Sequence, residues 1–114
     1  MSIFWCKCML QSRCRLTILN LDNEYFNNLI GVYVIWYGND TGNVISVGRG
    51  IIRDELTKRK KDGKVLAYGP DLFVTWAEVP QASLDGVEAF LCKGLNPILR
   101  QAVKSHDLIT VNLP

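Results

Sequence analysis

The chain of 114 residues lacks an apolar segment that could cross a membrane. Its longest apolar runs, such as residues 32–37, are far shorter than the roughly 20 residues that a membrane-spanning helix needs. It also lacks internal repeats, low-complexity linkers and the small-residue cleavage site that would follow the apolar core of a secretory signal. We therefore expect an intracellular, cytoplasmic protein without a membrane segment.

Charged residues are not abundant enough to indicate disorder. They make up 21% of the chain, and hydrophobic residues make up 48%, which is close to ordinary globular usage. The length suits one domain. We expect a folded domain over residues 30–114, preceded by an irregular cysteine-containing arm over residues 1–29.

Histidine and cysteine are too few and too poorly spaced for a typical zinc site. The chain has one histidine, His106, and four cysteines, Cys6, Cys8, Cys14 and Cys92. A tetrahedral site could in principle use them, but structural zinc sites pair their ligands about two to four residues apart on each side. We therefore do not expect zinc. Because disulfide frameworks are typical of small secreted domains, we expect reduced, partly buried thiols and a histidine at the surface.

The net charge is only +2, but it is unevenly distributed. Residues 49–64 have a net charge of +4, whereas the rest of the chain has a net charge of −2. The basic residues of this stretch are Arg49, Arg53, Lys58, Arg59, Lys60, Lys61 and Lys64. Such a run is typical either of a solvated helix face or of a phosphate-binding surface.

The part of the chain after residue 30 begins with a hairpin signal. Residues 31–37 are β-branched and aromatic, and residues 43–48 repeat this pattern. Between them, residues 38–42 have the glycine, asparagine and aspartate of a turn. This combination predicts two antiparallel strands.

A basic helix is predicted next, over residues 51–62. Ile52 and Leu56 are four residues apart and define its buried face. Gly63 is placed where a helix would end. Residues 65–68 favour a short extended segment.

A third strand and a second helix follow. Residues 71–79 are strand-like, and Ser83 can cap a helix over residues 84–95 that ends at Asn96. Residues 108–113 are a candidate final strand. The order β-β-α-β-α predicts an α+β fold.

One acid, Glu88, falls on the apolar face of the second predicted helix. At about 100° per residue, Leu84, Leu91 and Leu95 cluster in one direction and Glu88 lies among them. A buried carboxylate is costly unless it is paired, hydrogen-bonded or bound to a metal. Glu88 is therefore either an edge residue that reaches solvent or an arginine, or a metal ligand at the end of a groove.

Several short motifs occur in an order that resembles the GIY-YIG nuclease domain. They are Gly31-Val32-Tyr33, Ser46-Val47-Gly48, Gly48-Arg49-Gly50-Ile51-Ile52-Arg53-Asp54 and Val87-Glu88-Ala89-Phe90-Leu91. The resemblance covers residues 30–113. It implies a small central sheet of three antiparallel strands flanked by helices, as in intron homing endonucleases and a bacterial excision-repair nuclease subunit.

The resemblance also implies hydrolysis of DNA phosphodiester bonds with one divalent cation, usually Mg²⁺. It implies that Tyr33 helps to activate the attacking water and that Glu88 binds the metal. Among the arginines of the basic helix, Arg53 is preferred to Arg59 as the catalytic residue. A cation and an arginine suit this chemistry because negative charge develops on the phosphate. The basic residues expected to contact the nucleic acid, DNA or RNA, are Arg49, Lys58, Arg59, Lys60 and Lys61.

The sequence departs from the family pattern at two positions. Ser46 replaces the tyrosine of the second motif, which keeps a hydroxyl but loses reach and phenolic acidity. Glu55 aligns with the family's catalytic arginine. The family often has an asparagine near its end, and both Asn96 and Asn112 are candidates.

Three functions are compatible with these residues. The first is a divalent-metal-dependent endonuclease, which explains Tyr33, the basic helix and Glu88 together. The second is a catalytically degenerate domain that binds nucleic acid or a protein partner without cleavage, which Ser46 and Glu55 favour. The third is a structural or protein-interaction domain. A domain this small commonly gains specificity from a partner protein or from a second copy of itself.

Overall fold

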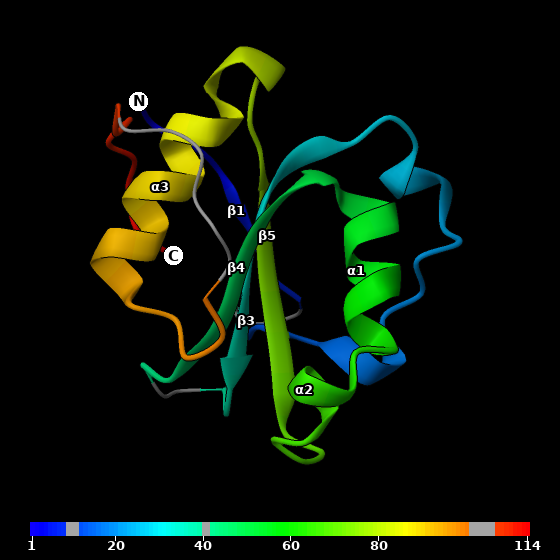
Figure 1. Cartoon of the computed structure of the whole chain (residues 1–114). Helices are drawn as coiled ribbons and strands as arrows, with labels where there is room; N and C mark the ends of the chain where they lie inside the picture. The colour runs from blue at the N-terminus through cyan, green and yellow to red at the C-terminus, as the bar shows by residue number, and fades with distance from the viewer. Residues whose placement is uncertain (9–11, 40–41, 101–106) are drawn as a thin grey trace.

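The computed structural model describes residues 1–8, 12–39, 42–100 and 107–114. Its elements, with η for 3-10 helices, are β1 (Trp5–Cys6), β2 (Cys14–Arg15), η2 (Leu16–Ile18), η3 (Glu24–Phe26), β3 (Ile30–Tyr37), β4 (Val44–Ile51), α1 (Ile52–Lys60), α2 (Gly63–Leu66), β5 (Leu72–Glu78), η4 (Gln81–Ser83) and α3 (Leu84–Leu95). The chain is an α+β protein in which α1 and α3 cover opposite faces of one antiparallel sheet (Figure 1). None of the described helices is long and apolar enough to cross a membrane.

The three long strands form the predicted centre of the sheet, with β3 between β4 and β5. β3 is buried along nearly its whole length because helices lie on both sides of it. Val32, Val34 and Trp36 pack with α3 residues, whereas Tyr33 and Ile35 pack with α1 residues. The pairing of β3 with β4 confirms the predicted hairpin, although β4 runs further than its sequence pattern indicated.

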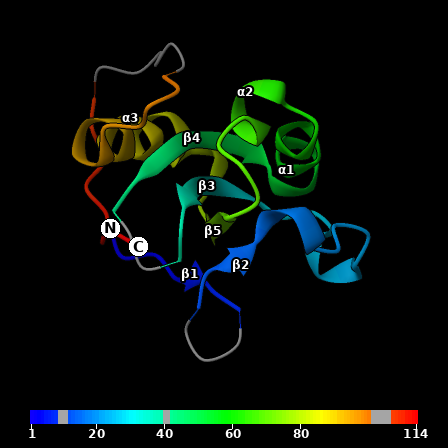
Figure 2. The same ribbon diagram turned by 90° about the horizontal axis from the view of Figure 1, so that it is seen from below.

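Two short strands from the arm extend the sheet beyond the prediction. β1 and β2 both pair antiparallel with β5, so that Cys6 lies opposite Trp76 and Cys14 lies opposite Val74. The described sheet therefore has five strands rather than the expected three, and the arm is not irregular throughout (Figure 2). Each arm strand is only two residues long, which is too short for a period-two pattern to be visible in the sequence.

α1 occupies the predicted basic helix, and α2 replaces a predicted extended segment. Both residues predicted to face the core from α1 are fully buried. α1 ends at Lys60, and Gly63 begins α2 instead of ending α1. The carboxylate of Asp62 accepts a hydrogen bond from the backbone N–H of Lys64. This cap starts a helical turn, which is why the prediction of an extended segment over residues 65–68 was wrong.

α3 has its predicted bounds and brings the chain back to the sheet. It ends where Asn96 adopts a left-handed conformation with a φ of 51°. Beyond it, the backbone N–H of Leu99 donates to the carbonyl of Ile45, and Leu99 forms a parallel bridge with Ser46 of β4. Ile98 and Leu99 therefore lie along the outer side of β4.

The strand predicted over residues 108–113 is not formed among the described residues. The side chain of Asn112 instead bonds the backbone N–H and carbonyl of Ile3, at 2.8 and 2.9 Å. The indole N–H of Trp5 donates to the Asn112 carbonyl at 2.8 Å. Side-chain contacts thus replace a strand ladder and hold residues 110–114 beside the arm.

The cysteines of the arm are not all reduced. Cys8 and Cys14 form a disulfide, so the expectation of reduced thiols was wrong for this pair. The fold brings their Cα atoms to 4.9 Å, a separation that a disulfide can span. Cys6 and Cys92 are free and partly buried, and burial raises the pKa of Cys92 to about 11. His106 lies outside the described residues.

Candidate functional site at the edge of the sheet

Tyr33, the predicted catalytic residue of the first motif, lies at the centre of the sheet. Its Cα pairs with that of Gly48, the glycine of the second motif, on the neighbouring strand β4. A Cβ atom at Gly48 would overlap the Tyr33 hydroxyl, so only a glycine lets the ring lie across β4. The ring packs on the α1 side and has no exposed surface. Strand register therefore brings the two motifs together.

The hydroxyl of Tyr33 meets a carboxylate from α1. Tyr33 Oη donates to Glu55 Oε1 at 3.4 Å, and the other carboxylate oxygen lies 3.3 Å from Lys58 Nζ. Burial raises the pKa of Tyr33 well above its ordinary value, the charge of Arg59 opposes this rise, and Glu55 adds to it. The phenol is therefore protonated at neutral pH.

Glu88 lies on the buried face of α3, as its position in the predicted helix indicated. Only 7% of its surface is exposed. Its Oε1 lies 3.4 Å from Arg49 Nε on β4, and the same nitrogen lies 2.7 Å from Asp85 Oδ1. Burial raises the pKa of the Glu88 carboxyl, and Arg49 partly offsets the rise. The pairing with an arginine was one of the two expected alternatives, and the metal-ligand role stays a prediction.

Tyr33 and Glu88 approach β4 from the two faces of the sheet, one covered by α1 and the other by α3 (Figure 1). The negative charge of Glu88 raises the pKa of Tyr33, and that of Glu55 raises the pKa of Glu88. Gly48 and Gly50 leave β4 without side chains at these two positions, and a Cβ at Gly50 would lie 3.3 Å from Glu55 Cγ. The glycines of β4 therefore make room for Tyr33 and Glu55, and the charge of Glu88 joins them in one electrostatic cluster.

Arg53, the preferred catalytic arginine, binds the segment before β3 instead of Tyr33. Its Nε donates to the Leu21 carbonyl at 2.7 Å, and its Nη2 donates to the Asn23 carbonyl at 2.9 Å and to Asn27 Oδ1 at 2.8 Å. Three charge-assisted hydrogen bonds fix the guanidinium there. In this structure Arg53 holds the η3 segment against α1.

Arg59, the alternative arginine, is the cation whose charge acts on Tyr33. Its Nη1 lies 3.2 Å from Asp62 Oδ2, and 18% of its side chain is exposed. Its Nε is buried and has no hydrogen-bond partner within the described part of the chain. Of the two arginines weighed from the sequence, Arg59 is thus the one placed near the tyrosine.

The lysines predicted to bind nucleic acid are only partly available. Lys60 Nζ donates to the Leu19 carbonyl at 2.7 Å. Lys58 pairs with Glu55, but 64% of its side chain is exposed. Lys61 is exposed, and so is Lys64 at the start of α2. The exposed positive charge of the stretch therefore gathers where α1 ends and α2 begins.

The remaining sequence candidates do not complete a catalytic site. Ser46 is 2% exposed and pairs with Ile35 on β3, so its short side chain is enclosed in the sheet. Asn96 ends α3, and the Asn112 side chain is bound to the arm. The sequence singled out Glu55 as a departure, but not as the hydrogen-bond partner of Tyr33. The one sequence feature that could have indicated a role for Glu55 at the site was its alignment with the family's catalytic arginine.

Glu88 is the cation ligand that the sequence predicts. No group of three or more His, Cys, Asp or Glu side chains that could hold a metal ion occurs within residues 1–8, 12–39, 42–100 and 107–114. Mg²⁺ commonly uses only one or two protein carboxylates, together with water and phosphate oxygens. The carboxylate oxygens of Glu88 fit that donor chemistry, provided that Glu88 exchanges Arg49 for the cation.

Known proteins give no independent family assignment. No family model matches the chain, and no curated protein or solved structure is significantly similar to it. The resemblance to GIY-YIG nucleases therefore rests on the sequence motifs alone.

Proposed function

We propose that the chain is a degenerate GIY-YIG-like domain that binds nucleic acid without cutting it. The order of the long strands, with the first motif on central β3 and the second on β4, supports the family resemblance. The proposed loss of cleavage rests on one observation. The Tyr33 hydroxyl donates a hydrogen bond to the carboxylate of Glu55, which stands at the position where the family has an arginine.

A carboxylate at this position opposes phosphodiester cleavage. Cleavage develops negative charge on the phosphate, which a cation stabilises and an acid destabilises. Tyr33 has no exposed surface and a raised pKa, so it neither contacts water nor accepts a proton from it. Both departures from the family pattern, Ser46 and Glu55, therefore remove functions that the reaction needs.

Binding needs only exposed positive charge, which the chain retains. Lys58, Lys61 and Lys64 lie at the junction of α1 and α2, and Lys61 and Lys64 are not held by the acids of the cluster. Phosphate contacts of this kind release counterions and bind either DNA or RNA, with an affinity that falls as salt rises. The proposed ligand is accordingly the phosphate backbone, without base specificity.

Charge reversal on two faces tests the binding surface. We expect Lys61→Glu to weaken binding of a fluorescent duplex about 10-fold at low salt, in fluorescence anisotropy, and to flatten the salt dependence. The matched control is Lys93→Glu on α3, which changes the net charge equally on the other face of the sheet. An equal loss in both variants would mean that net charge, rather than this surface, governs binding.

A metal-dependent nuclease is the second candidate, and the buried acid of α3 favours it. Glu88 is 7% exposed, lies next to Arg49, and acts electrostatically on Tyr33. Glu88 would hold the divalent cation, which would supply Lewis-acid stabilisation of the phosphate. Incubation of supercoiled plasmid with Mg²⁺ separates the candidates. Cleavage that Glu88→Ala and Tyr33→Phe both abolish would establish the nuclease and contradict the proposed non-cleaving function.

A further inference from the structure

The arm borders an open cavity of about 1000 Å³, separate from the β4 cluster. All three arm cysteines, Cys6, Cys8 and Cys14, line it. Its aromatic lining residues are Phe4, Trp5, Tyr25, Phe26 and Trp76. A thiol and a disulfide thus share one solvent-accessible space.

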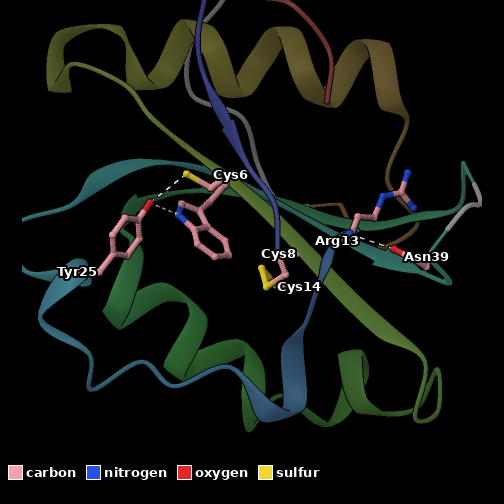
Figure 3. The surroundings of a disulfide bond; sticks show 7 residues. Cys6, Cys8, Arg13, Cys14, Tyr25 and Asn39 are labelled. Carbon is pink, nitrogen blue, oxygen red and sulfur yellow. Dashed lines mark hydrogen bonds between the residues drawn. A yellow bond between two sulfur atoms is a disulfide. The ribbon is translucent and has the colours of Figure 1, made fainter. Parts of the chain in front are cut away.

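The free thiol of Cys6 has a polar partner there. Cys6 Sγ lies 3.0 Å from Tyr25 Oη, and the indole N–H of Trp76 donates to the same oxygen at 3.2 Å (Figure 3). Because the indole occupies one lone pair of that oxygen, the hydroxyl proton of Tyr25 can be donated to the sulfur. Such a donor stabilises the negative charge of an attacking thiolate.

Strand register places Cys6 within reach of the disulfide. Cys6 lies opposite Trp76 and Cys14 lies opposite Val74, on the same edge of β5. Two residues along a strand correspond to about 6.6 Å, and disulfides span Cα separations of about 4.4 to 6.8 Å. Both cysteines also pack against the core on the α1 side. The Cys6–Cys14 separation expected from the register therefore lies within the span of a disulfide.

The two sulfurs of the disulfide differ in their surroundings. Cys14 is 2% exposed and Cys8 is exposed. Attack on the Cys14 sulfur would release Cys8 into water, where a thiolate is best solvated. The surroundings therefore favour Cys14 as the electrophile and Cys8 as the leaving group.

We propose that the arm is a thiol–disulfide exchange site in which Cys6 attacks the Cys14 sulfur of the Cys8–Cys14 disulfide. The Cys6 thiol gives its proton to solvent, the Cys6–Cys14 bond forms, the Cys8–Cys14 bond breaks, and Cys8 leaves as a thiolate that takes a proton. No oxidant or reductant is consumed. The exchange moves the free thiol from the partly buried Cys6 to the exposed Cys8.

Tryptic mapping of the full chain tests the exchange. Lys7 and Arg13 separate the three cysteines, so trypsin places each on its own peptide. The oxidised chain is incubated without reductant at mildly alkaline pH, its thiols are blocked with N-ethylmaleimide, and the peptides are identified by mass spectrometry. We expect Cys6–Cys14-linked peptides and blocked Cys8 to increase together with time. Only Cys8–Cys14 links with blocked Cys6, at every time, would overturn the proposal.

Three variants make the test specific. Cys8→Ser should form the Cys6–Cys14 disulfide on mild oxidation, and its failure to do so with an unchanged circular dichroism spectrum would overturn the geometry. Tyr25→Phe should slow the exchange about 2- to 10-fold, which is the worth of one hydrogen bond. An unchanged rate of exchange would overturn the role of Tyr25 as a hydrogen-bond donor to the Cys6 sulfur. The control Cys92→Ser removes the free thiol of α3 and should leave the exchange unchanged.

Discussion

The two edges of the sheet differ in how much freedom they leave to their reactive side chains. At the β4 edge, Tyr33 has no exposed surface and Glu88 has 7%, and both are held by neighbouring charges. At the arm edge, Tyr25 is 51% exposed and lines an open cavity beside Cys6. The candidate catalytic residues Tyr33 and Glu88 are thus enclosed. The accessible polar groups lie instead at the arm, for which the sequence motifs predicted no site.

Local sequence explains this difference. β4 has glycines at positions 48 and 50, so the Tyr33 ring of β3 and the Glu55 side chain of α1 lie directly against the strand. The arm strands are two residues long and leave space between β5, η3 and the last residues of the chain. Packing therefore protects one edge and leaves the other open to small molecules.

The largest expected effect comes from filling the space at Gly48. Gly48→Ala places a methyl group against the Tyr33 ring, and overpacking of this kind lowers the free energy of unfolding by about 3 kcal/mol. Gly94→Ala is the control, because a methyl group there meets open space in α3 and should be neutral or stabilising by up to about 1 kcal/mol. Urea unfolding measures both. Equal stability of Gly48→Ala and the unchanged chain would show that Tyr33 is not enclosed.

Reduction of the disulfide at the arm edge should lower the stability of the chain. A cross-link between Cys8 and Cys14 closes a short loop, which corresponds to about 2 kcal/mol of stability in the chain-entropy account. We expect a phosphine reductant to lower the free energy of unfolding by that amount. A variant with both cysteines replaced by serine serves as control and should not respond. A response of the same size in the control would place the effect elsewhere.

A smaller effect is expected from protonation at the β4 edge. The pKa of Glu88 is raised from its ordinary value of 4.5, so the folded chain holds this proton more tightly than the unfolded chain. Its stabilising contribution is complete below pH 4.5 and is lost as pH rises through the raised pKa. We expect the Glu88→Gln variant to lack the loss of unfolding free energy that accompanies the ionisation of Glu88 as pH rises. The exposed control Glu78→Gln should still show this loss. If the free energy of unfolding changed with pH in the same way in both variants, the account of Glu88 as a buried group with a raised pKa would be contradicted.

The smallest expected effect is on nucleic-acid affinity. Glu55→Gln removes a negative charge and releases Lys58 from its ion pair at 3.3 Å, so we expect duplex binding to tighten about 2-fold at low salt. Fluorescence anisotropy against salt concentration measures the change. Glu78→Gln, which removes an exposed acid at the end of β5, is the matched control and should leave the affinity unchanged. Weaker binding by Glu55→Gln would mean that Glu55 orders the binding surface instead of opposing it.

The long elements of the fold were predictable because each has its own periodic signal. The β3–β4 hairpin, β5 and α3 follow alternation or helical spacing in the sequence. β1 and β2 were not predictable, since two-residue strands exist only through their pairing with β5. α2 depends on one capping contact from Asp62, which propensity alone does not show.

The candidate site was predictable in its positions but not in its pairings. Glu88 stood out because a carboxylate interrupts an apolar helix face, and the structure buries it there. Arg53 was preferred from its motif, yet it binds carbonyls of a segment about 30 residues earlier, which only the tertiary fold brings near. The Tyr33–Glu55 hydrogen bond likewise joins a strand and a helix across the sheet surface.

The fate of a nucleic acid bound in the presence of Mg²⁺ tests the central claim most directly. The chain is mixed with supercoiled plasmid at low salt, binding is read from gel retardation, and the plasmid is then freed of protein and examined for nicks. A non-cleaving domain retards the plasmid and returns it intact, as does its Glu88→Ala variant. Nicked plasmid with the unchanged chain and intact plasmid with Glu88→Ala would contradict the account.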